Sequence, residues 1–139
     1  MARFMLDTDT CSYVMKRSYP SMLDRLQSTR AGEVCISVIT RIELEYGVRI
    51  SPKTARDAAA LAAFLPYVEV LELTESAASH YAEIRAELKR QGTPIGAHDL
   101  LIAAHARSLG LTLVTNNVAE FGRVKDLMLE NWVIPAPEA

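Results

Sequence analysis

The sequence contains little of what defines several other classes of protein. Its 139 residues include two cysteines, six glycines and six prolines. So few cysteines exclude the dense disulfide framework of small secreted domains, and so little glycine and proline excludes collagen-like and low-complexity chains. No apolar run reaches the ~18–20 residues that are needed to cross a bilayer. We therefore expect one globular domain, residues 1–139, without a membrane segment.

Neither the N-terminal residues nor the charge indicate export or bulk binding of nucleic acid. The apolar residues 4–6 run directly into Asp7, which interrupts the apolar stretch that a secretory signal requires. The formal net charge of −2 is opposite in sign to that of proteins that coat nucleic acid. We expect a cytoplasmic protein in which Cys11 and Cys35 are reduced thiols that pack in the core.

Segments typical of strands alternate with segments typical of helices along the chain. Short apolar runs rich in β-branched residues predict strands at 3–6, 33–37, 68–73, 111–115 and 128–134. Apolar residues at steps of three and four predict helices at 38–50, 53–64, 75–91 and 97–109. Strands separated by helices favour an α/β fold, in which a mostly parallel sheet carries helices on both faces.

Side chains with oxygen atoms follow two of these strands. Asp7 and Asp9 come directly after the first strand, and "TNN" (residues 115–117) with Glu120 follows the fourth. In open parallel sheets, ligands bind beyond the carboxyl ends of the strands. Carboxylate and amide oxygens suit a hard divalent cation. The two strand ends therefore predict a site for such a cation.

Two predicted helices carry further acids on faces that the apolar pattern predicts to be buried. In helix 38–50, Glu43 shares the apolar arc, whereas Glu45 faces water. In helix 97–109, Asp99 shares a face with apolar residues. An inward carboxylate is costly unless something pairs with it. The apolar arc of the first helix consists of Ile39, Ile42, Tyr46 and Ile50.

Each acid also has a purely structural explanation. Asp7 or Asp9 can cap the helix that follows, Asp99 can stabilise a helix start through the helix dipole, and Glu43 can pair with an arginine. These separate explanations do not account for three elements that each place an acid where the acids could converge. A single site accounts for all of them.

The motifs around these acids resemble those of one family, the PIN-domain ribonucleases, and among them the VapC-type toxins of bacterial toxin–antitoxin pairs. "FMLDTDTCSY" resembles the first acidic motif, with Asp9 in place of a common asparagine. "CISVITRIELEYG" resembles the second, with Glu43 as its acid and Gly47 as its trailing glycine, and "GTPIGAHDLLIAAHA" resembles the third, with Asp99 as its acid. "LVTNNVAEFGRV" followed by "ENW" resembles the closing segment, where Asn117 replaces a common aspartate and Glu120 is the nearest acid. The resemblance covers nearly the whole chain.

The resemblance implies a PIN-like three-layer α/β/α domain with a central, mostly parallel sheet of four or five strands. It also implies an endoribonuclease that uses Mg²⁺ or Mn²⁺ to activate water, with a structured RNA such as tRNA or ribosomal RNA as substrate. The implied partners are a VapB-like antitoxin protein and a second copy of the chain in a homodimer.

The residues that the resemblance places at the site have different implied roles. The metal ligands, direct or through water, are Asp7, Glu43 and Asp99. The fourth acidic position falls to Asn117 or Glu120, both counted as catalytic residues, while Thr115 and Asn116 support the site by orienting water or a carboxylate. For RNA contacts the candidates are Lys16 and Arg17, then Arg85, Lys89 and Arg90, and then Arg123 and Lys125.

Several other interpretations stay open at this stage. The basic pairs are also typical of an ordinary solvated face, and the three histidines lack metal-binding spacing, so we expect them to be structural or on the surface. "DTDTC" and "LVTN" also resemble motifs of haloacid-dehalogenase-like phosphatases, although Cys11 and the short remainder of the chain fit them poorly. A catalytically weak PIN domain that binds RNA or a partner is the non-enzymatic alternative. A dinucleotide-binding protein is disfavoured because no GxGxxG follows the first strand.

Overall fold

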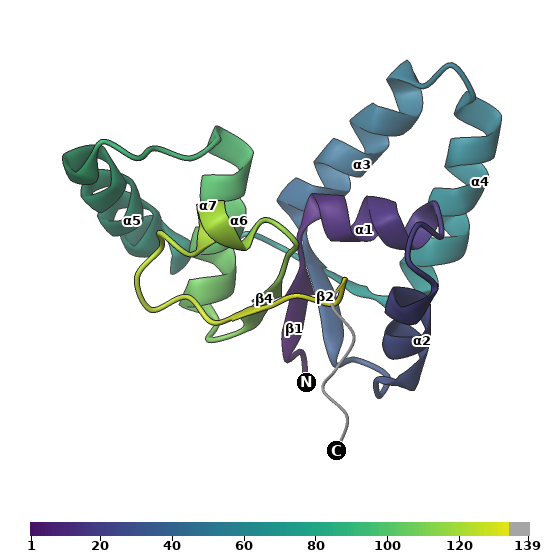
Figure 1. Cartoon of the computed structure of the whole chain (residues 1–139), viewed down its shortest axis with the longest axis horizontal. Helices are drawn as coiled ribbons and strands as arrows, with labels where there is room; N and C mark the ends of the chain where they lie inside the picture. Colours follow the sequence, from purple (N-terminus) through teal and green to yellow (C-terminus); the bar gives the residue numbers. More distant parts are fainter. Residues whose placement is uncertain (134–139) are drawn as a thin grey trace.

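A computed structural model describes residues 1–133 of the chain (Figure 1). In this part of the chain five strands form one sheet, and they are β1 (Phe4–Leu6), β2 (Val34–Ser37), β3 (Glu69–Leu71), β4 (Thr112–Val114) and β5 (Leu129–Glu130). The helices are α1 (Thr8–Met15), α2 (Pro20–Ser28), α3 (Val38–Ile50), α4 (Thr54–Phe64), the 3-10 helix η1 (Leu65–Tyr67), α5 (Ala77–Gln91), α6 (Ala97–Ser108) and α7 (Val118–Phe121). The predicted strand 128–134 is thus shorter than expected, and its last residue lies outside the described residues.

The sheet is parallel throughout and has β1 at its centre. The strand order is β3-β2-β1-β4-β5, so the chain adds strands first on one side of β1 and then on the other. Leu6 pairs with Ile36 of β2 and with Val114 of β4, which places the ends of these three strands level with one another. The residues that leave the strands therefore emerge at one edge, at the switch in strand order where such folds bind ligands.

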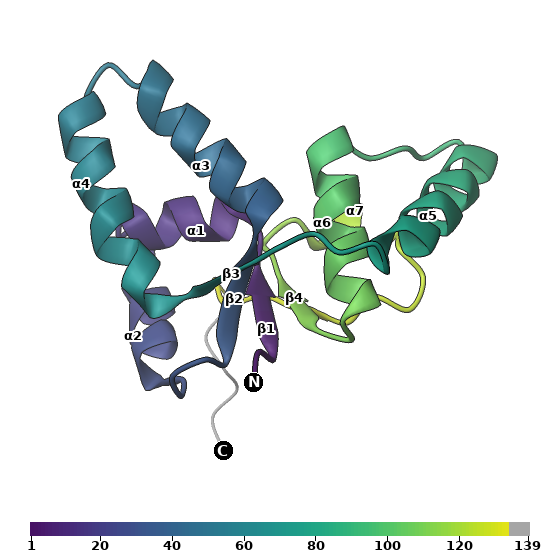
Figure 2. The ribbon, with the colours of Figure 1, turned by 180° about the vertical axis from the view of Figure 1, so that it is seen from behind.

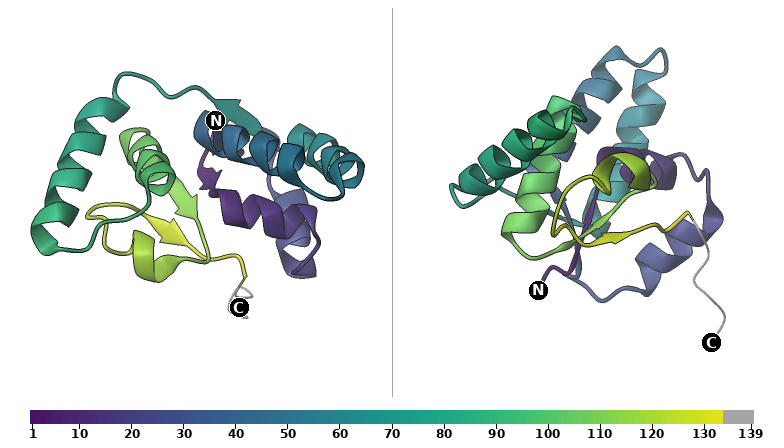
Figure 3. Two further views of the ribbon diagram at one scale, coloured as in Figure 1. Left: turned by 90° about the horizontal axis from the view of Figure 1, so that it is seen from above. Right: turned by 60° about the vertical axis from the view of Figure 1, so that its left-hand side comes forward.

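Side chains of β1 alternate between two cores. Phe4 and Leu6 pack with α1 to α4, whereas Met5 packs with α5 and α6. Figures 2 and 3 show these two groups of helices on opposite sides of the sheet. Burial on both faces explains why β1 is apolar at every position. The predicted three-layer α/β/α architecture is confirmed.

The last described residues are fixed against the start of the chain. The Trp132 ring meets Phe4 edge-on, with 5.4 Å between centroids, and the Arg25 guanidinium of α2 stacks on it at 4.9 Å. The Trp132 Nε1–H donates to Glu130 at 3.2 Å, and Glu130 also forms an ion pair with Arg25. These contacts fix β5 at the edge of the sheet.

The apolar pattern locates most helices but does not indicate α2 and α7. The predicted helices 38–50, 53–64, 75–91 and 97–109 agree with α3 to α6 within a few residues. Helix α2 begins at Pro20 and buries only Met22 and Leu26, and α7 has four residues. Neither is long enough to show a repeating apolar stripe.

The face of α3 that the apolar pattern predicts to be buried is exposed. Ile42, Tyr46 and Ile50 are 54%, 65% and 64% exposed, while Thr40 and Leu44 are the buried residues of this helix. The predicted core position of Tyr46 is therefore wrong. Helix α3 pairs with α4 in a hairpin that projects beyond the sheet (Figure 1), so its outer side has no neighbour within the described chain. The prediction that Glu45 faces water is confirmed.

Within residues 1–133 no helix is both long and apolar enough to span a membrane. Cys11 and Cys35 are buried free thiols, as predicted. Burial raises the pKa of Cys35 to about 12 and that of Cys11 well above its ordinary value. Both side chains are therefore unreactive packing groups near neutral pH.

Candidate active site

Asp7 is the first residue after β1, and it caps α1. Its Oδ1 accepts a hydrogen bond from the backbone N–H of Thr10 at 2.8 Å, and its own N–H donates to the carbonyl of Val114 in β4 at 3.0 Å. Burial raises the pKa of Asp7, and hydrogen bonds from Thr10 and Thr115 oppose this effect. Asp9 is exposed in the first turn of α1 and is not the cap. Asp7 thus has the capping role, and its carboxylate also lies at the edge of the sheet where ligands bind.

Asp99 lies in the first turn of α6, where the negative charges of four other acids act on its carboxyl group. Its pKa is raised to about 7. Burial is the largest cause, followed by the negative charges of Glu120, Glu43, Asp7 and Asp9. Four carboxylates distant in the sequence therefore act on one side chain.

Glu43 extends from α3 toward the starts of two other helices. Its Oε1 accepts a hydrogen bond from the Oγ1–H of Thr8 at 2.6 Å, and its Oε2 lies 3.2 Å from Nδ1 of His98, the second residue of α6. Oγ1 of Thr8 also lies 3.3 Å from Oγ1 of Thr40. Both carboxylate oxygens of Glu43 are therefore oriented, one by α1 and one by α6. His98 is exposed, as expected of a surface histidine, and it also contacts this acid of the site.

In the closing segment, residues 115–120, Asn117 and Glu120 lie on the side of α6, whereas Asn116 is directed elsewhere. Buried Thr115 accepts a hydrogen bond from the backbone N–H of Asn117 at 2.9 Å. Nδ2 of Asn117 donates to Oε2 of Glu120 at 2.5 Å, and Oε1 of Glu120 accepts from the backbone N–H at the N-cap of α6 at 3.4 Å. Asn116 instead accepts a hydrogen bond from Nδ2 of Asn131 at 3.1 Å. Glu120, oriented by Asn117, is the acid of this segment that approaches the cluster.

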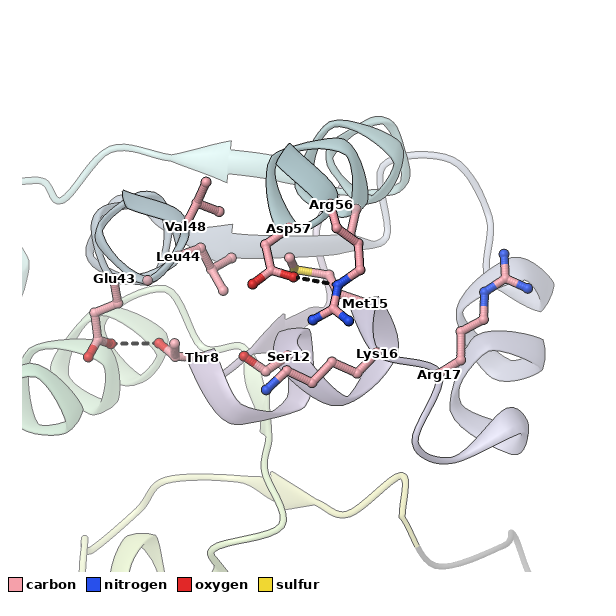
Figure 4. Close-up of a pocket in the computed structure, with 12 residues that line it drawn as sticks. Thr8, Ser12, Met15, Lys16, Arg17, Glu43, Leu44, Val48, Arg56 and Asp57 are labelled. Atoms are coloured by element: carbon pink, nitrogen blue, oxygen red, sulfur yellow. Dashed lines mark hydrogen bonds and ion pairs between the residues drawn. The ribbon is translucent and has the colours of Figure 1, made fainter. Parts of the chain in front are cut away.

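A groove of about 550 Å³ begins at Thr8 and Glu43 and runs between α1 and the α3–α4 hairpin (Figure 4). Lys16 and Arg17, two of the predicted RNA contacts, line it. The other candidates are distant from this groove and lie on or near α5. Three of these have partners within the chain or line another hollow: Arg85 donates to the Tyr81 hydroxyl, Arg90 pairs with Glu87, and Lys89 lines a separate hollow with Pro94 and Ile95.

The acids fit a hydrated divalent cation better than a compact metal centre. Within residues 1–133, no three His, Cys, Asp or Glu side chains stand close enough together to hold a metal ion as a group. Glu120, Glu43 and Asp7 are nevertheless near enough to raise the pKa of Asp99. Mg²⁺ keeps several of its waters and is commonly bound through one or two carboxylates. The donor set, all oxygen and negatively charged, matches that mode of binding.

Sequence reasoning missed three side chains near the site. Thr8 and His98 hold Glu43, and Arg56 lines the groove from α4. Thr8 directly follows Asp7 and His98 directly precedes Asp99, so adjacency to a predicted acid was the available signal. No such signal exists for Arg56, because its position depends on how the α3–α4 hairpin folds back over α1.

Comparison with known proteins identifies the class of the fold and of this site. Residues 4–127 match the PIN domain family, and the chain belongs to that family. A tRNA(fMet)-specific endonuclease VapC from Shigella flexneri is 44% identical over 95% of this chain and 99% of its own length. Ribonuclease VapC2 from Haemophilus influenzae is 45% identical, over 96% of this chain and all (100%) of its own. Within the PIN family the chain is thus a member of the VapC group.

A solved structure supports the same placement. The crystal structure of DNA-bound VapBC from Salmonella typhimurium matches this chain with a TM-score of 0.89 and 42% identity, over 95% of this chain and 99% of that one. Because the family is established over nearly the whole chain, the phosphatase and dinucleotide-binding interpretations are wrong.

Proposed function

We propose that the protein is a metal-dependent endoribonuclease that acts as the toxin of a bacterial toxin–antitoxin pair. The observation that carries the proposal is the contact of Glu43 with Thr8, which follows Asp7, and with His98, which precedes Asp99, in a chain whose VapC relatives are named as ribonucleases. We also propose that it acts in the cytoplasm, where its RNA substrate and its antitoxin would be found.

The residues of the cluster have distinct proposed roles. Asp7, Glu43 and Asp99 hold Mg²⁺ or Mn²⁺, directly or through water, and Glu120 takes the fourth acidic position with Asn117 as its orienting neighbour. A bound divalent cation supplies an activated water and offsets negative charge on the phosphodiester. Thr8 and His98 fix the direction of Glu43, and Thr115 supports Asp7 by hydrogen bonding.

The proposed substrate is a structured RNA, with tRNA ahead of ribosomal RNA. Two relatives that match nearly the whole chain are named tRNA(fMet)-specific endonucleases. The proposed protein partner is a VapB-like antitoxin, because several matching solved structures are VapBC complexes. We also propose a homodimer, which the exposed apolar row of Ile42, Tyr46 and Ile50 on α3 supports.

A cleavage assay tests the enzymatic proposal. Purified protein is incubated with total tRNA and Mg²⁺ or Mn²⁺, and the new RNA ends are sequenced. We expect defined cuts that EDTA and the Asp7→Asn substitution both abolish. Cuts that persist in Asp7→Asn would show a contaminating nuclease. RNA binding without any cut by the wild type would favour the catalytically weak PIN domain.

The antitoxin is tested by expression. We expect the wild-type chain alone to stop growth, and Asp7→Asn to be harmless. When the wild type is purified from its native host, a small protein should accompany it. A harmless wild type that purifies alone contradicts the toxin proposal.

A further inference from the structure

Gly47 stands in the middle of α3, where nothing in the described chain requires a glycine. It does not have a positive φ, and a Cβ built on it meets no heavy atom within 4 Å. Glycine inside a helix costs about 1 kcal/mol relative to alanine. An exposed glycine with this cost and no use within the chain indicates that another molecule approaches the backbone here.

The surface beside Gly47 is continuous with the candidate active site. Gly47 follows Glu43 by four residues and Ser12 follows Thr8 by four, so each lies about 6 Å further along its helix. All four residues line the same groove, and Figure 4 shows Thr8 and Glu43 in contact at one end of it. If the reacting bond of a polymer lies among the acids, the adjacent monomer of that polymer would therefore lie in this groove.

Positive side chains face each other further along the groove. In Figure 4 the Lys16 chain runs back along α1, so that its ammonium group lies beside Ser12, and Arg56 reaches toward it from α4. Nε of Arg56 donates to Asp57 at 3.2 Å, and Asp57 also accepts from the Ser51 hydroxyl at 2.5 Å. The terminal amino groups of Arg56 point into the groove, and with Lys16 they suit a phosphate.

The remaining wall of the groove is apolar. It is formed by side chains from α1, α3 and α4, namely Met15, Leu44, Val48 and Ala60. A volume of about 550 Å³ is in the range of pockets that enclose one small ligand. An apolar wall beside a pair of cations matches a nucleotide, with its base on the wall and its phosphate between the cations.

We propose that this groove binds the nucleotide next to the cleaved phosphodiester, with Lys16 and Arg56 on its phosphate and the backbone at Gly47 against the nucleotide. This inference rests on the proposed ribonuclease function and adds a specificity site to it. Charge favours a polyanion such as RNA, because three cations (Lys16, Arg17 and Arg56) face two carboxylates (Glu43 and Asp57) among the described residues that line the groove.

Filling the groove tests the proposal directly. Gly47→Met adds a side chain into open space on a helix, so the protein should fold at least as stably as the wild type. Ala62→Met places the same side chain on an exposed position of α4 outside the groove and serves as the matched control. We expect kcat/KM for tRNA to fall at least tenfold in Gly47→Met and to stay unchanged in Ala62→Met.

The cations are tested separately. We expect Lys16→Ala and Arg56→Ala each to raise KM about three- to tenfold and to weaken the salt dependence of RNA binding. Lys53→Ala, which removes an exposed charge outside the groove, should do neither. Anisotropy with labelled tRNA in EDTA measures binding in the absence of cleavage.

The outcomes separate this inference from the function on which it rests. If the wild type does not cut tRNA but Gly47→Met weakens tRNA binding in EDTA, the groove is an RNA-binding site and the enzymatic proposal fails. If Gly47→Met cuts and binds like Ala62→Met, the groove proposal is overturned. It is also overturned if Gly47→Met loses only the antitoxin, because the groove is then a protein docking surface.

Discussion

At the scale of single residues, Asp99 shows a conflict between function and stability. Its pKa is raised from 3.8 to about 7 in the folded protein, so the folded state binds the proton more tightly than the unfolded state. Between these two pKa values stability falls as the pH rises, and the full cost is present above pH 7. The ionised form of Asp99, which is needed to bind a cation, therefore destabilises the metal-free folded state.

The first prediction concerns Asp99→Asn. We expect the metal-free variant at pH 8 to be more stable than the wild type, by on the order of 1–2 kcal/mol, and to be inactive on tRNA. The gain should largely disappear at pH 3, which lies below both pKa values, because Asp99 is then mostly protonated in both states. Urea unfolding in EDTA at both pH values measures it. Equal stability of the two proteins at pH 8 contradicts the argument.

The second prediction concerns His98, which donates to Oε2 of Glu43. His98→Leu removes this donor, and we expect kcat to fall about three- to tenfold while KM is unchanged. In His98→Asn the side-chain amide takes the position of Nδ1, and most of kcat should return. Rates at saturating tRNA and Mn²⁺ affinity by calorimetry measure the effect. If kcat of His98→Asn is no higher than that of His98→Leu, His98 does not position Glu43.

At the scale of elements, Ser37 links the helices that carry Glu43 and Asp99. Its Oγ accepts a hydrogen bond from the backbone N–H of Ile39 at the start of α3 and lies 2.8 Å from Nδ1 of His105 on α6. His105 is fully buried, and its Nε2 has no partner among the described residues. One hydroxyl thus joins the two helices beneath the site.

The third prediction is that Ser37→Ala lowers the free energy of unfolding by about 1–2 kcal/mol. It removes the cap of α3 and the partner of Nδ1 of His105. Ser21→Ala, at an exposed position of α2, should stay within about 0.5 kcal/mol of the wild type. Urea unfolding at pH 7.5 makes the comparison. A loss as small as that of Ser21→Ala would show that water replaces the hydroxyl.

The sequence predicts the positions of the helices and strands better than it predicts which face of α3 is buried. Apolar runs locate the five strands, and the parallel arrangement follows from the helices between them. The burial of α3 does not follow, because Ile42, Tyr46 and Ile50 are apolar and exposed, and periodicity records only that apolar side chains share a face. The acids were found from their neighbours in sequence, whereas Arg56 depends on a tertiary crossing that no local pattern records.

At the scale of the whole molecule, the exposed row on α3 allows the proposed homodimer to be tested. The fourth prediction is that Tyr46→Glu converts a dimer to a monomer without lowering the melting temperature, because Tyr46 is 65% exposed in the single chain. Glu45→Gln, on the polar side of α3, should leave the dimer intact. Light scattering after size-exclusion chromatography measures both. A wild type that is already monomeric refutes the homodimer.

The central position of β1 has a consequence during synthesis. Asp7 leaves the ribosome early, but its neighbours are Val114, the last residue of β4, and Thr115, which follows it. Strand β5, beside β4, is held by Trp132 near the end of the described chain. A partly made chain therefore lacks one wall of its acidic cluster. On the proposed function, a nascent toxin cannot attack the RNA of the machinery that is making it, and its nuclease appears only when translation of the domain is nearly finished.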